Sequence, residues 1–321
     1  MAVRDKILDL LRDQGGYISG EDISRSLGVS RTAVWKHVHS LLEEGYDIEA
    51  RRPLGYRLRG IPDLLLPREI QRDLDARVLG RNILHFHRLG STNEVARELA
   101  RKGAPEGTVV VAEEQTAGKG RWGRNWHSPP RSSISLSLIL RPRLAPPDTP
   151  QVTLLAAVAV AGALRSACGL EAGIKWPNDV LVGGRKVCGI LTELEAEMEE
   201  VRFLVLGIGV NANQAEEDFP PEIRGRATSL RLESGRAVNR VAVARSLLAE
   251  LDRWYLVYLR EGFGPVAAGW KGFNLTLGRR VTVSSPQRVL EGTARDLAED
   301  GGLLVELEDG RIARVLAGEV L

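Results

Sequence analysis

Residues 115–131 place the strongest constraint on the fold of this chain. They read QTAGKGRWGRNWHSPPR, and strand-like runs at 108–113 and 133–140 flank them. Residues 118–123 fit G-x-G-x-x-G, but the dinucleotide fingerprint requires a helix directly after the turn. Pro129 and Pro130 forbid a long helix there. The segment is therefore predicted to be a cationic loop between two strands, mobile until an anionic ligand orders it. A basic surface loop without a ligand is the alternative.

Length, charge and cysteine usage narrow the class of protein. A chain of 321 residues predicts two or three domains. The net charge of +2 means that any nucleic-acid contact must be local. The charged N-terminal residues do not resemble a signal peptide, and the longest apolar run, 152–164, is too short to span a bilayer. Cys168 and Cys188 form no metal or CxxC pattern, so we expect a cytoplasmic protein without a membrane partner.

The first sixty residues have the pattern of a helix-turn-helix. Apolar residues recur at helical spacing in 3–11 and 23–27, and Ser30 can cap a third helix whose inward apolar positions are predicted to be 34, 38, 41 and 42. Alternating runs at 46–50 and 55–59 predict a hairpin, the wing of a winged helix. A small helical domain that binds a protein is the alternative. The residues expected to contact DNA are Ser30, Arg31, Thr32, Trp35, Lys36, His39, Arg51 and Arg52.

Two later segments carry candidate ligand-binding groups. Lys175 lies in an apolar strand of a predicted hairpin, where a lysine can act as a fixed positive charge. Residues 207–211, GIGVN, place glycines within a strand, where a ligand can approach the backbone closely. Ser91 and Thr92 precede a helical pattern. Their hydroxyls can cap that helix or face a ligand, and the spacing alone favours the cap.

Three motifs together resemble the biotin protein ligases. GKGRWGR at 118–124, KWPND at 175–179 and GIGVN at 207–211 have the order and spacing of that family, and Ser91-Thr92-Asn93 falls where the family has the same triplet. KWPND is highly specific, whereas the glycine loop alone is not. The order of winged helix, ligase core and small C-terminal barrel resembles the bifunctional members that also repress the biotin operon.

The resemblance implies an α+β chain with three domains and a linker. Residues 1–60 would form a winged helix-turn-helix DNA-binding domain, and 61–67 a linker broken by two prolines. Residues 68–272 would form a central mixed-sheet α/β ligase domain that binds biotin and ATP. The residue pattern of 68–78 predicts a short helix at its start. Residues 273–321, with short alternating strands and glycine turns, would form an SH3-like β-barrel of structural role.

The resemblance also implies a two-step reaction. The family joins biotin to ATP as biotinyl-5′-AMP and passes the biotinyl group to a lysine of the biotin carboxyl carrier protein, a subunit of acetyl-CoA carboxylase. The biotin carboxylate is the nucleophile, so the protein supplies position and charge. Mg²⁺ is expected with the triphosphate. The other expected partners are operator DNA and a second copy of the chain, in a homodimer.

The family's site residues carry over position by position. Two residues match the catalytic pair of the family: Lys175 would bridge carboxylate and phosphate, and Arg121 would close the loop. Asp179 is a possible outer-sphere metal ligand. Lys119 stands where arginine is frequent. Trp122 replaces a basic residue, and its role, in packing on the adenylate or in a dimer contact, stays open. The implied biotin contacts are Ser91, Thr92, Asn93, Gln115, Gly118, Gly120, Arg121, Lys175, Gly189, Gly207 and Gly209. The implied adenylate contacts are Lys119, Arg121, Arg124, Trp126, Asn178 and Asn211.

Four functions are compatible with these patterns. The favoured one is a ligase that is also a biotin-responsive repressor. A ligase whose N-terminal domain no longer regulates is disfavoured by the basic wing. A regulator without chemistry is disfavoured by Lys175 and the glycine loop. A lipoate or octanoate ligase is disfavoured by the KWPND motif.

Overall fold

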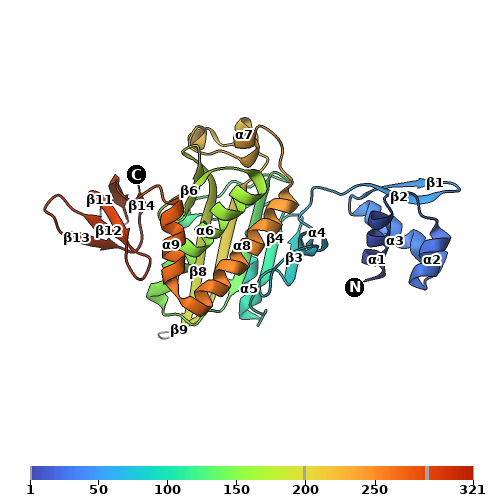
Figure 1. Cartoon of the computed structure of the whole chain (residues 1–321), viewed down its shortest axis with the longest axis horizontal. Helices are drawn as coiled ribbons and strands as arrows, with labels where there is room; N and C mark the ends of the chain where they lie inside the picture. The colour runs from blue at the N-terminus through green and yellow to red at the C-terminus, as the bar shows by residue number, and fades with distance from the viewer. Residues whose placement is uncertain (1, 198–199, 286–288, 321) are drawn as a thin grey trace. The chain divides into compact units, whose positions relative to one another are not determined.

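Helices and sheets alternate along the chain, which confirms the α+β prediction (Figure 1). The computed structural model describes residues 2–197, 200–285 and 289–320. By internal contacts the chain divides into two units, Met1–Leu64 and Leu65–Leu321.

The first unit is a winged helix-turn-helix, as predicted. Ser19 and Ser30 cap the second and third helices through their hydroxyls, which accept from the amides of Asp22 and Ala33. Gly28, with φ 64°, makes the left-handed turn between those helices. The elements are α1 (Val3–Gln14), α2 (Gly20–Leu27), α3 (Arg31–Glu43) and the antiparallel hairpin of β1 (Asp47–Arg51) and β2 (Gly55–Gly60). Their core contains Ile7, Leu11, Ile23, Val34, Val38 and Leu41.

The second unit is built on a seven-stranded sheet with the order β3-β4-β5-β9-β8-β7-β6. Among the described residues, β3–β4 is the only parallel strand pair of this sheet, so the sheet is mixed, as predicted. Its strands are β3 (Asn82–Phe86), β4 (Thr108–Ala112), β5 (Ser133–Leu140), β6 (Ala172–Lys175), β7 (Asp179–Val182), β8 (Arg185–Glu197) and β9 (Glu200–Asn211).

Helices cover both faces of this sheet (Figure 1). Alternate strand residues feed two separate cores: Val109 and Val111 join the larger one, and Val110 joins the smaller one beneath α5 (Thr92–Arg101). The larger core is covered by α6 (Thr149–Cys168), α8 (Arg240–Glu261) and α9 (Phe263–Phe273). Residues 146–168 are apolar and long enough to cross a membrane, but 67% of their most apolar stretch is buried, as in the core helix of a folded domain. A short helix, α7 (Leu230–Ser234), follows β9.

Residues 68–78 do not form the single short helix that their pattern suggests. The helix α4 (Pro67–Gln71) ends early, and the chain is extended at Arg72, with ψ 124°. The reason is tertiary. The buried carboxylate of Asp252 on α8 accepts from the amides of Arg77, Val78 and Leu79 at 2.7–2.8 Å, which holds those residues outside a helix.

A buried carboxylate ties the start of this unit to the base of the 115–131 loop. Glu113 accepts from the Leu65 amide at 2.6 Å, lies 3.1 Å from His85 Nε2 and pairs with the fully buried Arg240 at 2.8 Å. Its backbone carbonyl accepts from the Arg131 amide. Burial by itself would raise the pKa of Glu113, but His85, Arg240 and the Leu65 amide together hold that pKa below its ordinary value.

The C-terminal strands form a five-stranded sheet with the order β13-β12-β11-β10-β14. Trp176 joins this sheet to the central domain: its backbone amide donates to Thr276 Oγ1, and its indole Nε1 donates to the Gly301 carbonyl. Closure of the sheet into a barrel stays a prediction. The strands are β10 (Arg280–Ser284), β11 (Val289–Leu297), β12 (Leu303–Glu306), β13 (Ile312–Val315) and β14 (Glu319–Val320).

Candidate functional site

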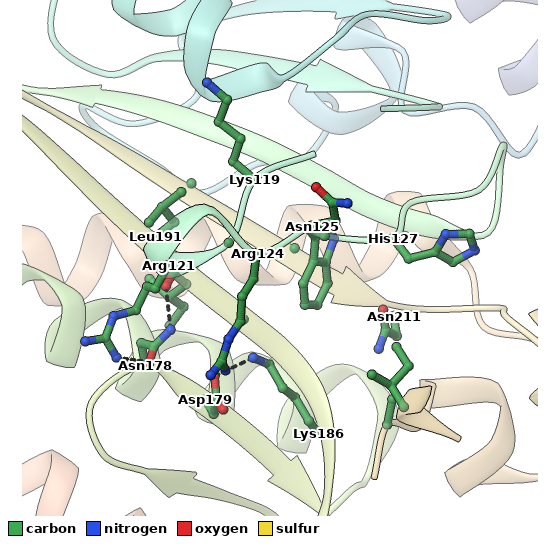
Figure 2. A pocket seen from close by; sticks show the side chains of 18 of the residues that line it. Lys119, Arg121, Arg124, Asn125, His127, Asn178, Asp179, Lys186, Leu191 and Asn211 are labelled. Atoms are coloured by element: carbon green, nitrogen blue, oxygen red, sulfur yellow. Dashed lines mark hydrogen bonds and ion pairs between the residues drawn. The ribbon is translucent and has the colours of Figure 1, made fainter. Parts of the chain in front are cut away.

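A cavity of about 760 Å³ lies on the face of the large sheet that carries α5. This volume is in the range of small-molecule sites. Its walls come from the N-terminus of α5, the 115–131 loop, β6 to β9, residues 219–227 and β14 (Figure 2). The ligase residues expected from the sequence all line it except Gly118: Ser91, Thr92, Asn93, Gln115, Lys119, Gly120, Arg121, Arg124, Trp126, Lys175, Asn178, Asp179, Gly189, Gly207, Gly209 and Asn211.

One end of the cavity is a neutral polar recess. Gln115 Oε1 accepts from both the amide and the hydroxyl of Thr92, at 2.8 and 3.0 Å. The Ser137 hydroxyl, fully buried on β5, lies 2.8 Å from Thr92 Oγ1 and 2.5 Å from Asn93 Oδ1. Ser91 occupies the N-cap position of α5, but its side chain makes no capping hydrogen bond, so the capping role that its spacing favoured is wrong. Ser91 is also part of the cavity wall.

Glycines make the floor of the cavity flat. A Cβ on Gly209 would lie 2.4 Å from Trp126 Cε2, and one on Gly207 would lie 2.1 Å from Asn93 Oδ1. A Cβ on Gly189, the β8 partner of Gly209, would lie 3.0 Å from Trp126 Cζ3. The Trp126 indole therefore lies directly on the sheet backbone, in a place that any side chain at 209 would occupy.

The other end of the cavity is cationic. Figure 2 shows Arg124, Asp179 and Lys186 converging there, with Lys186 Nζ 2.6 Å from Asp179 Oδ1. Arg124 binds Glu319 with both terminal nitrogens. The hydrogen bond from Arg124 holds the pKa of Glu319 below its ordinary value despite partial burial, and the charges of Lys175 and Lys186 lower it further. These three cations and Arg121 outnumber the two carboxylates, so this end suits a polyanion.

Arg121 closes the loop onto two other parts of the domain. Its Nη1 donates to Asn178 Oδ1 at 3.0 Å and to the Gly318 carbonyl at 2.9 Å. Burial lowers the pKa of Arg121, opposed by Asp179 and Glu319. Asn178 is itself fixed, because its Nδ2 donates to the Ile190 carbonyl. The loop thus has defined contacts with both the KWPND segment and the C-terminal sheet.

Lys119 lies outside the cationic cluster, whereas Trp122 packs against two of its arginines. Lys119 forms an ion pair with Glu94 and extends away from Arg121 and Arg124 (Figure 2). The Trp122 indole is 44% exposed and lies between the guanidinium groups of Arg121, at 4.6 Å, and Arg124, at 5.9 Å. Trp122 also has φ 55°, an unfavourable backbone conformation for a bulky residue. This placement leaves an exposed aromatic surface on the loop.

The carboxylates near the cavity do not form a metal site. Among the described residues, no group of three or more His, Cys, Asp or Glu side chains is placed to hold an ion. Asp179 is already paired with Lys186. One paired carboxylate does not fit a resident Mg²⁺ ion, which would instead arrive with the phosphates of a nucleotide. No step of the chemistry below is assigned to it.

Several residues of the cavity carry no signal in the sequence patterns. Lys186 sits in an apolar strand, as Lys175 does, and that feature could have identified it. Glu319 has no such signal, because it reaches Arg124 only through tertiary folding. Asn211 is held from behind the cavity wall by Gln214, a fully buried residue that does not line the cavity and donates to Asn211 Oδ1 at 3.2 Å, while Asn211 Nδ2 donates to the Thr228 carbonyl at 3.0 Å. The segment after β9 adds Phe219, Ile223, Gly225, Arg226 and Ala227 to the wall.

The residues expected to meet DNA are all on the surface of the first unit. Seven of them are exposed side chains on α3 and the wing: Arg31, Thr32, Trp35, Lys36, His39, Arg51 and Arg52. Ser30 is also exposed, but its hydroxyl caps α3. The exposed face is basic at its N-terminal half, while Val34, Val38 and Leu41 hold the opposite face in the core. The prediction that Leu42 also points inward is wrong: it is 42% exposed, because seven residues after Trp35 it lies on the same outward face of the helix.

Comparisons with known proteins cover the whole chain. Residues 85–211 match the Biotin/lipoate A/B protein ligase family, residues 3–57 an HTH domain and residues 276–321 the Biotin protein ligase C terminal domain. The chain is 42% identical to the bifunctional ligase/repressor BirA of Bacillus spizizenii, over 99% of this chain and 98% of that one. It is 38% identical to the biotin–[acetyl-CoA-carboxylase] ligase of Mycobacterium tuberculosis, over 72% and 85%. The biotin protein ligase of Aquifex aeolicus, solved with biotin and ATP, superposes with a TM-score of 0.64 at 30% identity, over 75% and 98%.

Proposed function

Because this chain belongs to the biotin protein ligase family, we propose that its cavity activates biotin with ATP and that the same chain acts as a repressor. The enzyme is an ATP-dependent, AMP-forming biotin–protein ligase. It forms biotinyl-5′-AMP and transfers the biotinyl group to a lysine of a biotin carboxyl carrier protein of acetyl-CoA carboxylase. The name of the mycobacterial relative, a biotin–[acetyl-CoA-carboxylase] ligase, supports that acceptor.

The observation that carries the proposal is the polarity gradient along one cavity. The recess of Thr92, Gln115 and Ser137 suits the neutral ureido ring of biotin. The glycine floor accommodates an aliphatic tail. The cationic end with Lys175 and Lys186 suits a carboxylate and a nucleotide triphosphate side by side. A lone biotin site would not need so much positive charge.

The chemistry follows from this arrangement. A carboxylate oxygen of biotin attacks the α-phosphorus of ATP, the bond from that phosphorus to the bridging oxygen breaks, and pyrophosphate leaves with the electron pair. In the second step a neutral lysine amine of the carrier attacks the biotinyl carbonyl, AMP leaves, and the nitrogen loses a proton. Charge develops on oxygen in both steps, so Lys175 and Arg121 act by position and electrostatics. No nucleophile from the protein is required.

The remaining site assignments belong to this proposal. Ser91, Asn93, Gly118, Gly120, Gly189, Gly207 and Gly209 surround biotin, and Lys119, Arg124, Trp126, Asn178 and Asn211 surround the adenylate. Asp179 orients Lys186. Mg²⁺ accompanies ATP as part of the substrate.

The regulatory role couples the loop to DNA. We expect biotinyl-AMP to order residues 115–131 and thereby favour pairing of two chains in the cytoplasm. Paired winged helices would then bind a palindromic operator with far higher affinity than one. The ordered loop presents the exposed Trp122, and Trp122→Ala tests whether that side chain contributes to pairing.

Two assays test the function. The purified chain is incubated with biotin, ATP and a carrier domain, and the mass of the carrier is measured; a carrier with its acceptor lysine replaced is the control. Absence of an ATP-dependent mass increase would refute the ligase. A gel shift with operator DNA, with and without biotin and ATP, tests the repressor. Biotinylation without any biotin-dependent shift would show a ligase whose N-terminal unit does not regulate.

A further inference from the structure

Trp35 is exposed on the helix that carries the DNA-binding face. It is the single tryptophan of residues 1–64, and 55% of its surface is accessible. In the other unit, Trp176 and Trp270 are at most 1% exposed. Burying an indole contributes strongly to the stability of a domain, and Trp35 makes little of this contribution to its own unit. Tryptophan is enriched at binding interfaces, because its ring is apolar and its N–H can reach a polar partner.

The indole of Trp35 is held in place before any partner binds. His39, one turn further along α3, stacks on it with ring centroids 5.4 Å apart and planes within 11°. His39 Nε2 in turn lies 3.8 Å from Glu43 Oε1. A stacked ring loses less conformational freedom on binding than a free one, so the pair forms a pre-organised apolar platform.

The surroundings of the platform indicate what covers it. Arg31, Thr32 and Lys36 are exposed beside it on the N-terminal half of α3, and the wing of the same unit exposes Arg51 and Arg52. An apolar patch with a cationic border matches a DNA groove, where phosphates flank the base edges. In helix-turn-helix proteins, residues near the start of the recognition helix contact those edges.

Base chemistry then narrows the contact to one kind of base. The edges that bases present in the major groove are hydrogen-bond donors and acceptors, with one apolar group, the C5-methyl of thymine. An indole offers an apolar ring and a single donor, Nε1–H, and no acceptor. Thymine matches both features, because its methyl group lies beside the O4 acceptor.

We propose that Trp35 is a specificity-determining residue that reads one thymine in each half-site of the operator through its methyl group. The proposal rests on the DNA-binding role given above. It predicts that the methyl group of one thymine contributes about fourfold to affinity, the value for burial of one methyl-sized group.

The test removes only that methyl group. Duplexes that bind the full chain in the presence of biotin and ATP are first selected from random sequences. Each thymine of the selected duplex is then replaced in turn by deoxyuridine, and dissociation constants are measured by gel shift. Wild type should lose about fourfold when the sensitive thymine of either half-site is replaced. Trp35→Ala should bind the parent duplex more weakly, by at least the same factor, and lose nothing further on that replacement.

A matched variant separates this contact from a general effect. Leu42 is 42% exposed on the same helix two turns further on, and Leu42→Ala should keep the full sensitivity to deoxyuridine. Circular dichroism checks that each variant is folded. Failure to select any sequence would refute the DNA-binding role itself. A selected duplex whose deoxyuridine forms bind wild type with unchanged affinity, or weaken wild type and Trp35→Ala equally, would refute the reading of thymine by Trp35.

Discussion

The contact between Gly209 and Trp126 leads us to predict that a side chain at position 209 weakens nucleotide binding. In Gly209→Ala the new methyl would lie 2.4 Å from the indole, about 1 Å short of the 3.4 Å at which ordinary contact begins. The sheet cannot yield, because β9 is paired on both sides at this residue. Trp126 belongs to the loop and is only partly buried, so the indole has to move into the space of the adenylate.

The size of the effect follows from the cost of overpacking. Forcing one methyl group into a packed site costs about 1–3 kcal/mol. Because a loop residue absorbs the clash, most of this cost should appear in ATP binding. The KM for ATP is then expected to rise about 5- to 150-fold. Biotin alone should lose less affinity, since the three nearest atoms to the new methyl all belong to Trp126.

The assay is pyrophosphate release at varied ATP and saturating biotin, with melting temperature measured in parallel. Gly272→Ala is the matched control: it lies in helix α9, and a methyl there meets no atom within 4 Å. That change should stabilise the protein by about 0.5–1 kcal/mol and leave the KM for ATP unchanged. In a chain that already carries Trp126→Ala, the Gly209→Ala change should raise the KM for ATP no further.

Two results would refute this reasoning. An unchanged KM for ATP in Gly209→Ala would mean that the position of Trp126 on the glycine floor does not matter to the nucleotide. A drop in melting temperature as large as that of a core overpacking variant, with ATP binding intact in the folded fraction, would mean that the sheet and not the loop absorbs the methyl.

Three further changes test other parts of the site. Lys175→Ala should abolish biotinyl-AMP formation, measured by mass spectrometry, at an unchanged melting temperature; normal yield would remove Lys175 from the chemistry. Arg121→Gly should break the contacts to Asn178 and Gly318 and release adenylate, so that bystander proteins become biotinylated on a streptavidin blot; unchanged retention would contradict loop closure. Glu113→Gln leaves Arg240 without its carboxylate and should cost on the order of 3–5 kcal/mol at neutral pH. Because the pKa of Glu113 is lowered in the folded state, its stabilising effect is fully present above the ordinary value of 4.5 and is lost as pH falls through the lowered value. The difference in unfolding free energy between wild type and variant, measured with urea, should therefore disappear in acid. A difference that does not depend on pH would exclude an ionised Glu113.

Local patterns in the sequence predict the parts of this fold that depend on local physics. The capped helices of the first unit and the alternating strands of the large sheet belong to this class. So do the glycines at 207 and 209, because a glycine within a strand costs stability and needs a reason. The KWPND segment is specific enough to indicate the reaction as well.

The features that sequence patterns do not predict depend on distant contacts. The helix expected over 68–78 ends early because Asp252 takes the amides of 77–79. Ser91 has the spacing of a cap, but no hydrogen bond shows it acting as one. Glu319 joins the site through a pairing with Arg124 across 195 residues of sequence, which no local pattern indicates.

The long sequence separations around the cavity have a consequence for folding kinetics. The Arg121–Gly318 hydrogen bond closes a separation of 197 residues, and Arg124–Glu319 closes a similar one. Contacts between residues so far apart in the sequence carry a large entropic cost of loop closure and form after the local elements. The complete cavity should therefore be absent from the folding transition state and present only in the native state. Ligands that bind it will slow unfolding and leave the refolding rate nearly unchanged. Biotin and ATP thus prolong the lifetime of the folded enzyme without helping a new chain to reach it.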